Sequence, residues 1–166
     1  LSDLVVFGPL KADDKPGLGE AFEAALLETG RPVILTGQSP PKNFAQRVAI
    51  GWDGSSACAK ALLAAMPYLA RAQHIQLLAI RKPNTTCESC DEAAEYLRMH
   101  GLNYAERQID AGNRPVGEVL LEAASEGGAD LLVLGGYGHS RLLQMFAGGV
   151  TKHVVAHATL PLFLVH

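Results

Sequence analysis

The sequence is poor in cysteine, in aromatic residues and in charge of one sign. Its 166 residues include three cysteines, which are too few for a disulfide framework and fit the reducing cytoplasm. The formal net charge is −3 and no basic block occurs, so nonspecific binding to nucleic acid or to an acidic membrane is not expected. No apolar run reaches the roughly 20 residues that span a bilayer. We therefore expect a cytoplasmic protein without a nucleic-acid or membrane partner.

Apolar residues make up 48% of the chain, which is enough to build a sizeable core. From Arg47 onward, short apolar runs alternate with stretches of helical spacing. The expected strands are 48–52, 75–80, 102–109, 131–134 and 162–165. The expected helices are 57–72, 89–101, 115–127 and 150–157. This order predicts an α/β fold with an open, mostly parallel five-stranded sheet and helices on both faces.

The beginning of the chain repeats the end of this unit. Residues 3–8 resemble 130–135, and residues 32–35 resemble 161–164. The segment 20–28 has helical spacing and fills the place of the helix between them. Two matched segments in matched order indicate two copies of one unit.

This repeat predicts the domain organisation. We assign 1–40 to the C-terminal part of a first, degenerate unit, 41–46 to a linker and 47–166 to a complete second unit. Because 3–8 already has the pattern of a core strand, we expect further sequence before Leu1.

A glycine-bearing segment follows the apolar run 131–134 and leads into the last expected helix. Gly135, Gly138 and Gly148 lie in it, and Gly149 stands where the helix begins. Glycines after a buried strand let backbone N–H groups approach phosphate oxygens, and a helix N-terminus adds its own donors. The alternative is that Gly135 and Gly138 only form a tight turn. Glycine spacing alone does not decide between the two.

Asp53 follows the first strand of the same unit, as Gly135 follows the fourth. In an open α/β sheet, the loops after the strands on either side of the chain reversal form the ligand crevice. A carboxylate there can accept hydrogen bonds from ribose hydroxyls or hold a metal-bound phosphate. The alternative is that Asp53 is a helix N-cap or a turn residue.

The spacing Gly135-x2-Gly138-x9-Gly148 resembles the nucleotide loop of ATP-binding universal stress proteins. Asp53-Gly54-Ser55 resembles the first loop of that family, and the likeness extends over 47–166 with 1–37 as the end of another copy. The resemblance implies a Rossmann-like fold of the adenine nucleotide α-hydrolase type. It implies binding of ATP, AMP or ADP, which Mg²⁺ can accompany, and a regulatory role in the stress response with at most weak ATPase activity.

The resemblance also implies which residues surround the nucleotide. Trp52 and Asp53 would line the nucleoside side, Ile80 would offer backbone groups to adenine, and Leu134 would pack near it. The residues around ribose and phosphates would be Gly135, Gly138, Gly148, Gly149, Val150 and Thr151. The family usually has Ser or Thr at the position of Gly149, so we expect weaker binding here because one hydroxyl contact is lost.

Two other functions compete with nucleotide-dependent regulation. One is an adenine nucleotide hydrolase or adenylating enzyme, but no catalytic base or nucleophile stands out, so we assign no catalytic residue. The other is a dimerisation module with an empty pocket, which Gly149 would favour. Cys87 and Cys90 lack the second pair of ligands that a zinc site needs, and we expect no metal site.

In the resembling family the terminal strands pair antiparallel across a two-fold axis. The resemblance therefore implies that 32–36 and 161–165 meet within or between chains. Both segments are short and apolar, and left exposed they would be edges that invite association. We expect a homo-oligomer, most simply a dimer through these strands.

Overall fold

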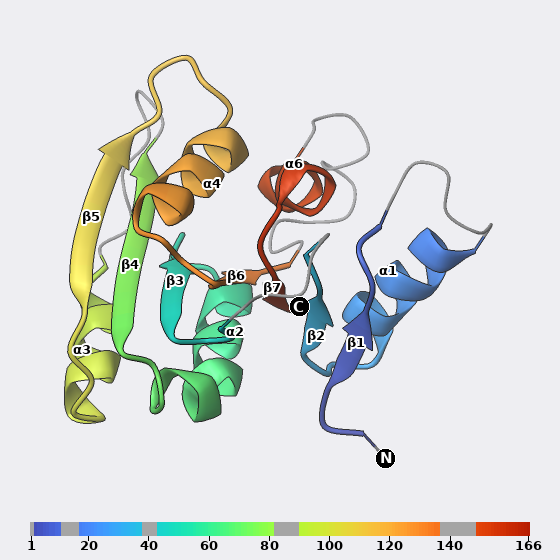
Figure 1. The fold of residues 1–166 in the computed structure, drawn as a ribbon, viewed down its shortest axis with the longest axis horizontal. Helices are drawn as coiled ribbons and strands as arrows, with labels where there is room; N and C mark the ends of the chain where they lie inside the picture. The colour runs from blue at the N-terminus through green and yellow to red at the C-terminus, as the bar shows by residue number, and fades with distance from the viewer. Residues whose placement is uncertain (1, 11–16, 38–42, 82–89, 137–148) are drawn as a thin grey trace.

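The computed structural model describes residues 2–10, 17–37, 43–81, 90–136 and 149–166. The strands are β1 (Val5–Phe7), β2 (Val33–Leu35), β3 (Arg47–Gly51), β4 (His74–Arg81), β5 (Ala105–Asp110), β6 (Leu131–Gly135) and β7 (Leu162–Val165). The helices are α1 (Leu18–Glu28), α2 (Ser56–Leu69), α3 (Asp91–Met99), α4 (Val116–Glu126) and α6 (Val150–His157). The alternation of strands and helices expected from the sequence is therefore confirmed (Figure 1).

The strands form one sheet in the order β1-β2-β7-β6-β3-β4-β5. All neighbouring pairs are parallel except β2 and β7. The mostly parallel sheet is confirmed, but the expected number of five strands was wrong, because the sheet has seven. All four residues of β7 are buried, so its free edge would be an exposed apolar ladder. Strand β2 covers that edge and brings β1 into the same sheet.

Helices cover both faces of the sheet (Figure 1). The helices α2 and α3 share one apolar cluster with alternate residues of β3, β4, β6 and β7. The helices α1, α4 and α6 share a second cluster with the remaining alternate residues. The helix α1 therefore packs on the same face of the sheet as α6.

The pairing between β2 and β7 has a symmetric register. Ile34 lies opposite Phe163, and the two occupy equivalent positions in the segments 32–35 and 161–164, which resemble each other in sequence. Val33 lies opposite Leu164, and Leu35 lies opposite Leu162. A local two-fold axis between two copies requires this register. The expected antiparallel meeting of the terminal strands is thus confirmed within a single chain.

The length and hydropathy of the helices bear on whether one of them could span a membrane. In the part of the chain that the structure describes, no helix is long and apolar enough to cross a membrane.

Candidate functional site

The chain reverses direction across the sheet at β3. From β3 it continues to β4 and β5 on one side, and β6 and β7 lie on the other side. Strands β3 and β6 are parallel neighbours, with Gly51 opposite Leu134, so they end at the same edge of the sheet. Ligands of open α/β sheets bind outside the carboxyl ends of the strands at such a point. The structure therefore brings the residues after β3 and after β6 together, as the sequence predicted.

The turn after β3 is held by its own backbone and side chains. The backbone N–H of Trp52 donates to the carbonyl of Leu78 at 2.8 Å, and the Trp52 side chain is buried. Asp53 is exposed, and its carboxylate accepts from the backbone N–H of Ser55 at 2.9 Å. Ser55 is the N-cap of α2, with its hydroxyl accepting from the N–H of Cys58 at 3.2 Å. Asp53 is therefore a turn residue and not the helix cap, and the turn holds its carboxylate at the surface.

Cys58 lies beneath this turn, and the sequence analysis did not identify it. Its thiol donates to the carbonyl of Gly51 at 3.3 Å. Burial raises the pKa of Cys58 to about 12, and the negative charge of Asp53 adds to the effect. The thiol is thus protonated at neutral pH and is a poor nucleophile. A small polar residue in the first turn of the helix after β3 is the sequence signal that could have drawn attention to it.

Gly135 ends β6 against the first turn of α2. A Cβ on Gly135 would lie 2.6 Å from the backbone nitrogen of Cys58 and 2.8 Å from the carbonyl carbon of Ala57. On the other side, the hydroxyl of Thr151 donates to the carbonyl of Gly135 at 3.4 Å. Glycine is therefore required here by helix packing, a reason that neither of the two readings of the glycine segment included. The result is a close approach between β6 and the N-termini of α2 and α6.

The helix α6 begins at this edge without a side-chain cap. Gly149 is its N-cap, and among the described residues a Cβ on Gly149 would meet no atom within 4 Å. Thr151 is buried in the first turn, whereas Val150 is 36% exposed. The N-terminal N–H groups of α6 thus lie beside Gly135, the arrangement expected of an anion site. There is room for the hydroxyl side chain that Gly149 lacks.

The remaining predicted residues lie in the core or outside the described residues. Leu134 is buried in the core cluster shared with α1, α4 and α6, and Ile80 packs against the same cluster from β4. Ile80 pairs with Ile109 on β5 and lies beyond the end of β3, so it is one strand away from the turn at Asp53. Gly138 and Gly148 lie outside the described residues, as does Cys87.

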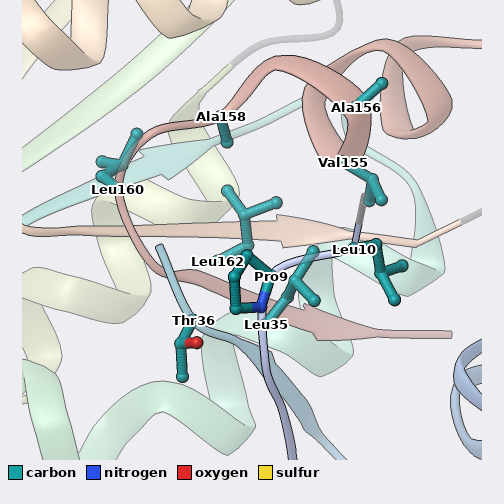
Figure 2. A pocket seen from close by; sticks show the side chains of 9 residues that line it. All are labelled: Pro9, Leu10, Leu35, Thr36, Val155, Ala156, Ala158, Leu160 and Leu162. Atoms are coloured by element: carbon teal, nitrogen blue, oxygen red, sulfur yellow. The ribbon is translucent and has the colours of Figure 1, made fainter. Parts of the chain in front are cut away.

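The described part of the chain also contains a small cavity away from this edge. Figure 2 shows it between the end of β1, the strand β2 and the C-terminal part of α6. Pro9, Leu10 and Val155 are among its lining residues, and its volume is about 20 Å³. Such a volume holds about one water molecule and no nucleotide.

Two histidines of α6, His153 and His157, lie one helical turn apart. The rings of His153 and His157 are stacked with their centroids 4.2 Å apart, and Nδ1 of His157 lies 2.8 Å from the carbonyl oxygen of His153. Across the described ranges, no three side chains of His, Cys, Asp or Glu gather as metal ligands would. This pair therefore gives no basis for assigning a metal centre.

Known structures resemble this fold over most or all of the chain. A universal stress protein from Archaeoglobus fulgidus DSM 4304 is 15% identical with a TM-score of 0.71; the match covers 98% of this chain and 60% of that protein. A universal stress protein solved in complex with cAMP is 23% identical with a TM-score of 0.57; the match covers 73% of this chain and 97% of that one. A family member from Burkholderia pseudomallei is 22% identical with a TM-score of 0.58, over 75% and 98%.

This chain thus spans 60% of the length of the Archaeoglobus protein. No curated protein is similar enough in sequence to count as a match. At the identities of the solved structures, the likeness establishes the fold alone. The family model described as "Universal stress protein family" matches residues 45–166. The chain therefore belongs to the universal stress protein family.

Proposed function

We propose that this chain binds ATP or a related adenine nucleotide at the edge of the sheet where β3 and β6 end. Its role would be regulatory, through nucleotide-dependent conformation or assembly in the stress response, with at most slow hydrolysis. AMP and ADP are related ligands of the same site, and Mg²⁺ would accompany the phosphates.

The observation that carries the proposal is the convergence of three elements. The turn after β3 holds the Asp53 carboxylate at the surface, where it can accept from ribose hydroxyls. Gly135 ends the neighbouring strand β6, and Thr151 ties it to the first turn of α6. A carboxylate on one side and helix N–H donors on the other suit a nucleoside that carries phosphates.

Family membership and one relative add to this support. A universal stress protein with the same fold was solved with cAMP, an adenine nucleotide. In the site that the family resemblance implies for this chain, Trp52 and Asp53 would contact the nucleoside. Ile80 and Leu134 would lie near adenine. The phosphates would lie toward Gly135, Gly149, Val150 and Thr151, together with Gly138 and Gly148 of the segment outside the described residues.

A regulatory role is favoured over catalysis by the chemistry at this edge. Cys58 lies beneath the turn that carries Asp53, and burial raises the pKa of its thiol to about 12 and keeps it protonated. Binding followed by a change of conformation therefore accounts for the residues better than group transfer.

We also propose that the chain contains the end of one unit and a complete second unit. The symmetric register of β2 and β7 supports this division, because Ile34 and Phe163 are equivalent positions that face each other. Self-association is a further part of the proposal. Since β2 and β7 already have partners on both sides, the edges left among the described strands are β1 and β5, and β1, where Val6 is exposed, is the edge next to these two strands. A single-chain mass in sedimentation equilibrium would contradict the association.

Gly138→Val tests the nucleotide site. A branched side chain at a glycine where phosphate should lie is expected to abolish ATP binding in titration calorimetry. Gly19→Val is the matched control, because Gly19 lies in α1, where an added Cβ meets no atom within 4 Å. Both variants should keep the circular dichroism spectrum of the wild type. Equal ATP affinity in wild type and Gly138→Val would show that the site is wrong, and absence of binding in the wild type would favour the empty dimerisation module.

A further inference from the structure

We infer that helix α1 of the N-terminal unit positions the start of the candidate nucleotide site, and that Leu26 is the positioning residue. The inference rests on the proposed function and adds its regulation: displacing the N-terminal segment should weaken nucleotide binding in the second unit.

The contact is between Leu26 and Gly136. Gly136 directly follows Gly135, and a Cβ placed on it would lie 2.9 Å from a terminal methyl carbon of Leu26. That distance leaves no room for a side chain larger than hydrogen without movement of Leu26. Leu26 is 0% exposed and packs in the same cluster as Leu134. The helix α1 therefore contacts the backbone at the end of β6 through Leu26.

Gly136 is fixed on its other sides by the second unit itself. Its N–H donates to the carbonyl of Val165 at 2.7 Å, and its carbonyl oxygen lies 2.9 Å from Nδ1 of His166. The backbone at Gly136 is therefore held between β7 and α1. A shift of α1 would be transmitted to Gly135, whose carbonyl bonds to Thr151 in the first turn of α6.

The helix is itself anchored away from this contact. The rings of Phe22 and Phe7 meet edge to face, with centroids 5.6 Å apart, so the first half of α1 packs on β1. Phe22 is 2% exposed, as buried as Leu26, but it is one turn further from Gly136 along the helix. Substitutions at Phe22 and at Leu26 therefore distinguish the stability of α1 from its contact with the candidate site.

An equivalent contact, with the roles of the two units exchanged, occurs at the other end of the sheet. Val155 precedes Pro161 by six residues, as Leu26 precedes Pro32, and Pro9 follows Gly8 as Gly136 follows Gly135. Figure 2 shows Val155 of α6 and Pro9 around one small cavity. Each unit's helix therefore reaches the turn after the other unit's strand. The contact at Gly136 follows from the symmetric pairing of β2 and β7 and is not an isolated approach.

The test compares Leu26→Ala with Phe22→Ala in the full chain. ATP and adenosine affinities are measured by titration calorimetry, and thermal unfolding reports the damage to stability. We expect Leu26→Ala to weaken ATP about five-fold or more, a usual size for coupling between sites. Adenosine should lose less, because Gly136 adjoins the phosphate side. Phe22→Ala should lower the melting temperature at least as much, yet change ATP affinity less than about two-fold, and Leu26→Met should restore binding.

A double-mutant cycle adds a readout that general destabilisation would not produce. Gly136 does not have a positive φ, so Ala can adopt its backbone conformation. Gly136→Ala alone should weaken ATP binding because its methyl group meets Leu26. In the Gly136→Ala, Leu26→Ala double variant that methyl group has space, so the two losses should not add.

The outcomes separate the two proposals. A wild type that binds no ATP overturns the proposed function together with this inference. A wild type that binds ATP, with Leu26→Ala and Phe22→Ala affecting affinity equally or with strictly additive losses in the cycle, overturns the inference and leaves the proposed function standing.

Discussion

Gly149 begins α6 without a side-chain cap, at the position where the family usually has Ser or Thr. Because a Cβ at this position would meet no atom of the described residues within 4 Å, Gly149→Ser should fit against them without strain. One net hydrogen bond of about 0.5–1.5 kcal/mol should tighten ATP binding by roughly two- to ten-fold. AMP should gain less, since it lacks the outer phosphates.

Gly149→Ala is the control for this change, because it adds the Cβ without the hydroxyl. Titration calorimetry with ATP and AMP measures all three proteins. If Ala and Ser tighten ATP equally, or if AMP gains as much as ATP, the hydroxyl does not have the assigned role.

Cys58 gives a prediction for the dependence of stability on pH. Its pKa is about 12 in the folded protein against 9.0 as the ordinary value, so both states are protonated below pH 9. As pH rises from about 9 toward 12, the thiol ionises in the unfolded state first, and this favours unfolding. The free energy of unfolding should therefore fall by up to about 1.4 kcal/mol per pH unit from this group.

Urea unfolding of the wild type and of Cys58→Ala between pH 7 and pH 10.5 measures this loss. The variant should be less stable at pH 7 because it lacks the bond to Gly51, but its stability should fall less above pH 9. Parallel curves for the two proteins would contradict the buried, protonated thiol.

The pair of strands β2 and β7 joins the N-terminal segment, with β1 and α1, to the rest of the sheet. Ile34 is 5% exposed and lies opposite Phe163, so Ile34→Asp would bury a carboxylate with no partner. We expect a loss of several kcal/mol in the free energy of unfolding, or detachment of the N-terminal segment.

Leu63→Asp is the control, because Leu63 on α2 is 54% exposed. It should cost about 1 kcal/mol or less. Urea unfolding monitored by circular dichroism compares the two variants. Equal losses would mean that the β2 and β7 pair does not hold the units together.

Strands and helices were largely predictable because each has its own periodicity. The run 75–80 became β4 (His74–Arg81), and the buried run after Asp130 became β6. Boundaries were less accurate where local hydrogen bonds decide them. Helix α2 ends at Leu69, and Arg71 and Ala72 form turn bonds back to Tyr68 and Leu69 instead of continuing the helix.

The sequence patterns did not predict the contacts between helices and strands. From the sequence, Gly135 was interpreted as a glycine of a phosphate loop or of a tight turn. The packing of α2 against it became visible only once the order of the strands was known. The Leu26 and Gly136 contact has the same origin. Strands β1 and β2 were also missed as members of this sheet, although the apolar edges of 32–36 and 161–165 correctly indicated that these segments meet.

At the scale of the whole molecule, the sheet joins β1 and β2 to the rest of the chain, and the candidate site and the small cavity lie at opposite ends of it. The edge formed by β3, β6 and α6 has the features of a nucleotide site, whereas the turn after β1 borders a cavity of about 20 Å³. The account therefore predicts one nucleotide for each chain, bound by the second unit, with the first unit acting through α1.

Titration of isotope-labelled wild-type protein with ATP, followed by amide chemical shifts, tests this central claim most directly. The account predicts saturable shifts that are largest at Asp53, Gly135 and Thr151. Absence of shifts at about 1 mM ATP, a concentration that detects binding of roughly −4 kcal/mol, would contradict it. Shifts centred instead on Leu10 and Val155 would contradict it as well, because they would place the ligand at the other end of the sheet.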